Sequence, residues 1–288
     1  MSETGHHTRF RSLYRQSLPG SRVNEDACGL QGDLAWIVDG ATGVSEGRIA
    51  GAESDAAWLA RFIGDQLANA GHPDGRVDEL LRQLEDDAAQ AFARAAGVPV
   101  PEEAGPSACL GLISAVREPP GSLALKGFFL GDVVALVLSE GRVLRWTDER
   151  AKPFERRTLA ALQDGHDRSA DLPDAVRRQI LENRTKLNHP DGYWVVNPLR
   201  PWAGRELRFS APVEAGAPVV LATDGFMRLV DVFDAYTDDT LYRALAAGKG
   251  EELLGELRDR ERRDETRQTF RRVKTHDDAT VLVIAAEG

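Results

Sequence analysis

Cysteine is scarce in this sequence: Cys28 and Cys109 are the only two among 288 residues. Two cysteines in a chain of this length argue against a disulfide framework and fit a reducing compartment. No stretch approaches the roughly twenty consecutive apolar residues that a membrane span needs. The polar, basic N-terminus also lacks the apolar core of a secretion signal. We therefore expect a cytoplasmic protein that makes no membrane contact.

Positive charge is also under-represented. The chain has 36 lysine and arginine residues against 46 aspartate and glutamate residues, a formal net charge of −10 at pH 7. This surplus of acid disfavours non-specific binding to nucleic acids. A glycine-rich phosphate loop, a Cys-x-x-Cys pair and internal repeats are missing as well, so nucleotide-binding folds and structural zinc sites have no local support.

The remaining composition is that of a globular domain. With 42% hydrophobic and 28% charged residues, the chain can bury a substantial core without dividing into two domains. We expect a flexible N-terminal segment over residues 1–20 and a single domain over residues 21–288. Apolar residues recur at helical spacing over residues 51–70 and 77–96. Alternating charges predict a further, solvated helix over residues 253–272.

Five acidic patches punctuate the chain, and most of them lie beside short apolar runs. The patches are residues 24–26, 39–40, 131–132, 224–225 and 277–278. Apolar runs lead into the second and fourth patches, over residues 34–38 and 218–222, and another follows the fifth over residues 280–284. Such runs, bounded by turn residues, are typical of buried strands. Residues 108–113 and residues 123–138, the latter broken near Gly131, predict successive antiparallel strands.

A carboxylate at the end of a buried strand is held by the sheet while its oxygens stay accessible at the rim. Hard divalent cations such as Mg²⁺ and Mn²⁺ prefer this oxygen-rich geometry. Glycine after the aspartate allows a sharp turn that can direct a backbone carbonyl to the same place. A single Asp-Gly pair is more often a turn than a ligand. The order and context of all five patches therefore carry the prediction of a metal site.

In order and spacing, the five patches resemble those of the metal-dependent serine/threonine protein phosphatases of the type 2C class, the PPM family, in its bacterial form. The resemblance extends over about residues 21–286. It implies an α+β fold in which a two-sheet antiparallel β-sandwich is flanked by helices in an α-β-β-α arrangement. It also implies a centre of two Mn²⁺ or Mg²⁺ ions at one end of the sandwich, with a third ion in some bacterial members.

The family's principal metal ligands correspond to individual positions of this chain. Asp39 matches the aspartate that bridges both metals, and the carbonyl of Gly40 matches a ligand of the second metal. Asp224 and Asp277 match the other ligands of the first metal, with Asp278 in the place of the usual asparagine. In this family the two cations share a water, lower its pKa toward neutrality and neutralise the phosphate oxygens. No cysteine or serine nucleophile is then required.

Three further acids complete the implied metal site. Glu25 and Asp26 match an acidic pair that acts mainly through metal-bound water. Asp132 matches the aspartate that, together with Asp224, holds the third metal. The polar residues that usually follow this aspartate are replaced here by two valines, which weakens the match at the third site more than at the first two.

The phosphate-binding residue departs from the family pattern. Its arginine usually lies where this chain has Ser21, so Arg22 is the candidate for that role, with Arg48 as a substitute. The alternative for Arg22 is a solvated surface arginine. Residues 41–43 lack the histidine that many relatives carry there, so protonation of the leaving group would fall to metal-bound water.

Residues 148–212 correspond to the family's flap, a variable region beside the metal centre that is implicated in substrate choice. Apolar periodicity weakens here, and several prolines interrupt it. Tyr193, Trp194 and Trp202 either form a contact surface in the flap or pin a long loop onto the sandwich.

The resemblance predicts an enzyme that uses Mn²⁺ or Mg²⁺ to hydrolyse phosphoserine and phosphothreonine in proteins, opposes a serine/threonine kinase and acts as a monomer. Two alternatives stay open. A closed flap would favour a small phosphorylated metabolite as the substrate. A pseudophosphatase, which keeps the sandwich to hold a signalling partner, would explain the displaced arginine. Retention of Asp39, Asp224 and Asp277 together favours activity, because a decayed site has no chemical reason to keep three carboxylates.

Overall fold

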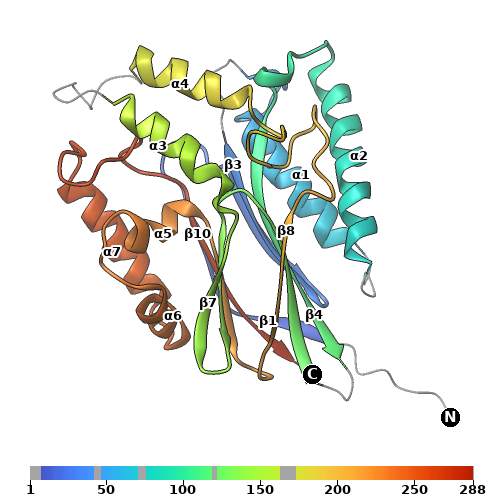
Figure 1. Ribbon diagram of the computed structural model, residues 1–288, viewed down its shortest axis with the longest axis vertical. Coiled ribbons are helices and arrows are strands. Elements are labelled where there is room, and N and C mark those ends of the chain that lie inside the picture. Colours follow the sequence, from blue (N-terminus) through green and yellow to red (C-terminus); the bar gives the residue numbers. More distant parts are fainter. Residues whose placement is uncertain (1–7, 42–46, 71–75, 119–121, 163–172, 288) are drawn as a thin grey trace.

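The computed structural model describes residues 8–41, 47–70, 76–118, 122–162 and 173–287. Across these residues, two five-stranded antiparallel sheets pack face to face, and helices cover the outer face of each (Figure 1). This arrangement confirms the predicted α-β-β-α sandwich. No helix in the described ranges is long and apolar enough to cross a membrane.

The first sheet joins strands from both ends of the chain. Its order is β1 (Arg9–Leu18), β10 (Ala279–Glu287), β9 (Pro218–Ala222), β6 (Val134–Ser139) and β7 (Arg142–Trp146). Its outer face packs against α5 (Asp224–Asp231), α6 (Asp238–Ala246) and α7 (Gly250–Arg263). Apolar side chains from these helices and from β6, β9 and β10 form one continuous buried cluster.

Two long helices cover the outer face of the second sheet. Its order is β2 (Asp26–Gln31), β3 (Leu34–Ala41), β4 (Ser107–Glu118), β5 (Ser122–Leu130) and β8 (Leu207–Pro212). The helices are α1 (Asp55–Asn69) and α2 (Val77–Ala96), and the short 3₁₀ helix η1 (Glu102–Ala104) precedes β4. Helix α1 begins four residues later than predicted, because the Ser54 hydroxyl accepts a hydrogen bond from the Ala57 N–H at 3.0 Å and caps the helix there.

Strand β3 shows how the sequence specifies this sandwich. Trp36 and Val38 pack toward α1 and α2, whereas Ala35 and Ile37 point into the core between the sheets. Side chains alternate between the two faces of a strand, so a strand buried on both faces appears in the sequence as a continuous apolar run. The same alternation places Asp39 on the inter-sheet face, at the end of the strand.

The chain changes sheet at Gly131. Strand β5 pairs antiparallel with β4, as predicted, and ends at Leu130 in the second sheet. Strand β6 begins at Val134 in the first sheet, so β5 and β6 are successive but not paired. Gly131 has a φ of +74°, and a Cβ there would lie 2.3 Å from the Cys109 Sγ, so glycine is required. The crossing leaves Asp132 at the rim of the sandwich. The two valines after it are buried in the core, where polar side chains would be unfavourable.

Two predicted boundaries need correction. The sequence predicts a flexible segment over residues 1–20, but β1 lies within it and pairs with β10 along its whole length. Backbone hydrogen bonds, rather than an apolar run, hold this edge strand. The charged helix predicted over residues 253–272 is shorter in the structure, because α7 ends at Arg263 and Asp264 caps it. The Asp264 carboxylate accepts the backbone N–H groups of Thr269 and Phe270, each at 3.1 Å.

The flap contains helices as well as loops. Helices η2 (Glu149–Ala151), α3 (Lys152–Ala160) and α4 (Asp174–Arg184) lie at one end of the sandwich (Figure 1). The Asn183 side-chain amide donates to the Phe154 carbonyl at 3.0 Å and to the Thr158 hydroxyl at 2.9 Å, which ties α4 to α3. Trp202 is fully buried against the second sheet and pins the flap, whereas Tyr193 lines a cavity.

Candidate metal centre

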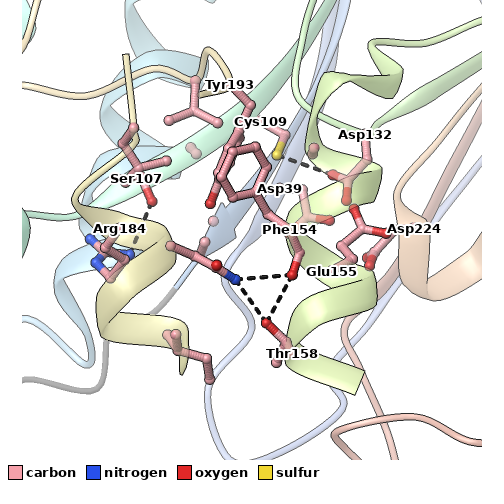
Figure 2. Close-up of a pocket in the computed structure, with 18 of the residues that line it drawn as sticks. Asp39, Ser107, Cys109, Asp132, Phe154, Glu155, Thr158, Arg184, Tyr193 and Asp224 are labelled. Atoms are coloured by element: carbon pink, nitrogen blue, oxygen red, sulfur yellow. Dashed lines mark hydrogen bonds between the residues drawn. The ribbon is translucent and has the colours of Figure 1, made fainter. Parts of the chain in front are cut away.

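A cavity of about 240 Å³, here called the central cavity, opens at the end of the sandwich beside α3 and α4. Its acidic wall consists of Asp39, Asp132, Asp224 and Asp277. Its flap side includes Phe154, Glu155, Arg184 and Tyr193 (Figure 2). The backbone of Gly40 also lines it. Five of the predicted site residues, far apart in the sequence, are therefore brought together by the two sheets.

Asp39 lies at the end of β3, opposite Asp26 of β2 in the antiparallel register. Burial, followed by the negative charges of Asp26 and Asp224, raises the pKa of Asp39 well above its ordinary value. The next residue, Gly40, approaches the neighbouring backbone so closely that a Cβ would lie 2.6 Å from the Glu25 carbonyl oxygen. A tight backbone contact thus fixes the Asp39-Gly40 pair at the rim.

Asp26 links the two sheets. Its Oδ2 accepts hydrogen bonds from the Thr223 hydroxyl at 3.0 Å and the Thr280 hydroxyl at 2.7 Å. Its Oδ1 is buried and has no hydrogen-bond partner within the described residues. Desolvation, with the charges of Asp278 and Asp224, raises the pKa of Asp26 to about 8, although the threonine hydrogen bonds lower it. A buried oxygen without a partner is a reason to expect a cation or a water beside it.

Asp224 and Asp277 approach the central cavity from the first sheet. Asp224 begins α5, and its neighbour Gly225 packs against the loop before β10 with no room for a side chain. Asp224 stays accessible through the cavity, and partial desolvation with the charge of Asp277 raises its pKa to about 7. Asp277 instead pairs with Lys274 Nζ at 2.9 Å and with Arg228 Nη2 at 2.6 Å. These cations outweigh the effect of burial and lower the pKa of Asp277.

Glu155 and Cys109 also line the central cavity, although the sequence did not predict either of them as a site residue. Figure 2 shows Glu155 of α3 directed toward Asp132 and Asp224. Desolvation, followed by the charge of Asp132 and a hydrogen bond with it, raises the pKa of Glu155 to about 9. The Cys109 thiol donates to Asp132 Oδ1 at 3.2 Å. Nothing in the sequence distinguishes Glu155 from the charged residues around it. Cys109 could have been found from the pairing of β3 with β4, which places it opposite Asp39.

The remaining acids lie beside the central cavity. Glu25 accepts a hydrogen bond from the Ser54 hydroxyl, and it lines a neighbouring cavity of about 530 Å³ that also contains Lys274. Asp278, in the place of the family's asparagine, accepts the backbone N–H groups of Gly20 and Glu25, each at 2.7 Å. Asp278 therefore holds the loop that leads into β2 and its acidic pair.

The two candidate phosphate-binding arginines are not brought to the acidic wall. Arg22 is exposed in the loop before β2, and Arg48 is exposed before α1. Neither is among the described residues that line the central cavity. Positions 42 and 43, which belong to the stretch where relatives carry a histidine, lie outside the described residues.

No group of three or more histidine, cysteine, aspartate and glutamate side chains in the described part of the chain is arranged to hold a metal ion as it stands. The donor set nevertheless suits Mn²⁺ or Mg²⁺, because it consists of carboxylates and a backbone carbonyl. The unpartnered Asp26 oxygen and the raised pKa values of Asp39 and Asp224 show carboxylates that lack compensating positive charge. These residues therefore fit a divalent cation.

The crowded carboxylates predict an unusual pH dependence of stability. In EDTA, the melting temperature is expected to fall as the pH rises from about 5 to about 8. Asp26 and Asp224 have folded-state pKa values of about 8 and about 7, against an ordinary 3.8. Between the ordinary value and the raised folded-state value, the unfolded chain releases a proton that the folded chain still holds, so stability falls progressively over that range of pH and levels off above it. Asp277 does not titrate in this range, because its pKa is lowered.

Thermal unfolding followed by circular dichroism would check this expectation. Excess Mn²⁺ should reverse the slope, because a cation binds the ionised carboxylates and stabilises the folded chain. Asp224→Asn should flatten the slope in EDTA. Equal slopes for the wild-type protein and Asp224→Asn would contradict the assignment of this pH dependence to the acidic wall.

Comparisons with known proteins agree with this fold. A family model described as protein phosphatase 2C matches residues 17–259. The Mycobacterium tuberculosis serine/threonine phosphatase PstP/Ppp is structurally similar, with a TM-score of 0.57, 17% identity and coverage of 98% of this chain and 99% of its own. The PstP catalytic domain in complex with two manganese ions gives a TM-score of 0.55 at 18% identity, covering 98% and 100%. Stp1 of Staphylococcus aureus gives 0.57 at 13% identity, covering 98% and 95%. No curated protein sequence matches significantly.

Proposed function

Because this chain belongs to the protein phosphatase 2C family and is a phosphatase of that type, we propose that it hydrolyses phosphoserine and phosphothreonine monoesters in proteins with Mn²⁺ or Mg²⁺. The observation that carries the proposal is the meeting of four aspartates from both sheets in one cavity. The structurally similar PstP and Stp1 are serine/threonine phosphatases, and one PstP structure contains two manganese ions.

In this proposal the metal ligands are those implied by the family. Asp39, the Gly40 carbonyl, Asp224 and Asp277 would hold two cations, Asp132 with Asp224 would hold a third, and Glu25 and Asp26 would act through water. Bound divalent cations would supply positive charge to the phosphoryl oxygens and lower the pKa of the attacking water. The chain orients these ligands in advance. Buried Arg228 fixes Asp277, and Thr223 and Thr280 fix one oxygen of Asp26.

We also propose that the enzyme acts as a monomer in the cytoplasm on the products of a serine/threonine kinase. Both cysteines are free thiols, as expected in a reducing compartment. The exposed large apolar side chains of the described residues are Leu13, Val98 and Leu181, which are scattered over separate segments. Scattered residues of this kind do not form the contiguous apolar patch typical of a stable interface.

Hydrolysis of a phosphothreonine peptide and of p-nitrophenyl phosphate, each with Mn²⁺ and with EDTA, would test the proposal. Turnover of both compounds that disappears in EDTA is the expected result. Turnover of small esters alone would identify a small-molecule phosphatase. A folded, Mn²⁺-loaded protein that hydrolyses neither compound would be a pseudophosphatase, and the proposed activity would be wrong.

A further inference from the structure

Lys274 lies in the loop between α7 and β10, where three cavities meet. Its side chain lines the central cavity, the neighbouring cavity beside Glu25, and a third cavity of about 440 Å³ beside α3. The Lys274 side chain is 60% exposed, whereas that of its partner Asp277 is 19% exposed. The ammonium group therefore lies between the acidic wall and the two adjacent cavities.

Two cations pair with Asp277, and Lys274 is the more exposed of them. Lys274 Nζ contacts one carboxylate oxygen of Asp277 at 2.9 Å, and Arg228 holds the other at 2.6 Å. Arg228 is only 8% exposed and also pairs with the buried Glu261 at 2.8 Å, so it anchors Asp277 without help from the lysine. The exposed end of the pair is the lysine, whose long flexible stem can move while the Asp277 carboxylate stays fixed. Lys274 can therefore turn from Asp277 toward another anion while Arg228 continues to hold the carboxylate.

Few other cations are available to an anion in the central cavity. Among the described residues, Arg184 and Lys274 are the cationic side chains that line it. The buried Arg184 guanidinium donates to the carbonyl oxygens of Glu103 and Gly105, so these donors are committed to the fold. Arg22, predicted for phosphate binding, is exposed and absent from the lining.

We propose that Lys274 contacts the phosphoryl group of the substrate, the role that the family resemblance assigns to Arg22. This inference rests on the proposed phosphatase function. An ammonium group forms short, charge-assisted hydrogen bonds with phosphoryl oxygens, and its flexible four-carbon stem allows it to turn from Asp277 toward the cavity. When Asp277 serves as a metal ligand, it no longer neutralises Lys274, and the ammonium group is left to stabilise negative charge on the phosphoryl oxygens.

Four variants would test this role: Lys274→Ala, Lys274→Arg, Arg22→Ala and the control Lys126→Ala. Lys126 is an exposed residue of β5 and lies outside the three cavities. For each variant, kcat and KM for p-nitrophenyl phosphate, the inhibition constant of inorganic phosphate and the Mn²⁺ dissociation constant would be measured. Lys274→Ala is expected to lower kcat/KM and to weaken phosphate inhibition by about 10- to 100-fold. Lys274→Arg should recover part of both effects, and Lys126→Ala should change neither.

The Mn²⁺ dissociation constant separates phosphate binding from a merely structural role. Mn²⁺ affinity should not weaken in Lys274→Ala, because Arg228 still orients Asp277. Unchanged phosphate inhibition in Lys274→Ala, or a loss of activity explained entirely by weaker Mn²⁺ binding, would overturn the inference. A loss of phosphate inhibition in Arg22→Ala, with no such loss in Lys274→Ala, would also overturn the inference. Absence of Mn²⁺-dependent turnover in the wild-type protein would instead contradict the proposed function itself.

Discussion

Asp39→Asn is expected to lower kcat/KM for p-nitrophenyl phosphate by about a thousandfold or more, because Asp39, which we propose as a metal ligand, would lose its charge. The change is nearly isosteric, so packing around the end of β3 should persist. Stopped assays at saturating Mn²⁺ would measure the effect. Asp65→Asn is a matched control, because Asp65 is exposed on α1 and does not line the described cavities.

Stability measurements on Asp39→Asn would separate a lost charge from a damaged fold. Burial, followed by the charges of neighbouring carboxylates, raises the pKa of Asp39, so a neutral amide avoids both the cost of burying a charge and the repulsion. In EDTA at pH 8, the variant should therefore melt at or above the wild-type temperature. Added Mn²⁺ should raise the melting temperature of the wild-type protein but not that of the variant. Near-normal turnover by Asp39→Asn would remove Asp39 from the metal centre.

Arg228→Met is expected to lower the free energy of unfolding by about 3 kcal/mol, because removing one partner of a buried ion pair leaves an uncompensated charge. Arg228 bridges Glu261 and Asp277 from a nearly buried position. The loss should stay near the lower end of the usual range, since Glu261 keeps its contacts with Arg258 and His276. Urea unfolding in EDTA would measure the difference without a contribution from bound metal.

Arg243→Met provides the matched control for this measurement. Arg243 pairs with Asp239 one turn away on α6, and its side chain is 71% exposed. A solvent-exposed pair of this kind contributes little to stability. Equal, small effects of Arg228→Met and Arg243→Met would show that Arg228 is not the anchor of Asp277, and the argument for Lys274 would lose its basis.

The sandwich and most of its acidic wall could be predicted because their signals are local. Strands buried on both faces give continuous apolar runs, and Asp39 and Asp224 follow such runs within two residues. The period of two along β3 even indicates which face Asp39 occupies. Convergence of residues far apart in the chain, by contrast, came from the family resemblance and not from any local pattern.

Other features could not be predicted, because their causes are not local. Strand β1 is an edge strand held by backbone pairing with β10, and its mixed polar sequence shows little alternation. Glu155 reaches the central cavity only because the flap folds α3 over it. Lys274 is one cation among 36 in the sequence, and only its contact with Asp277 distinguishes it. Spacing in the sequence contains no information about such contacts.

Anomalous X-ray scattering from a crystal soaked in Mn²⁺ would test the central claim most directly. The account predicts manganese peaks in the central cavity, in contact with Asp39, Asp224 and Asp277, and a Lys274 ammonium group that has left the Asp277 carboxylate. It would be contradicted by a fully soaked crystal with no manganese in the central cavity and with Asp277 still paired to Lys274 and Arg228.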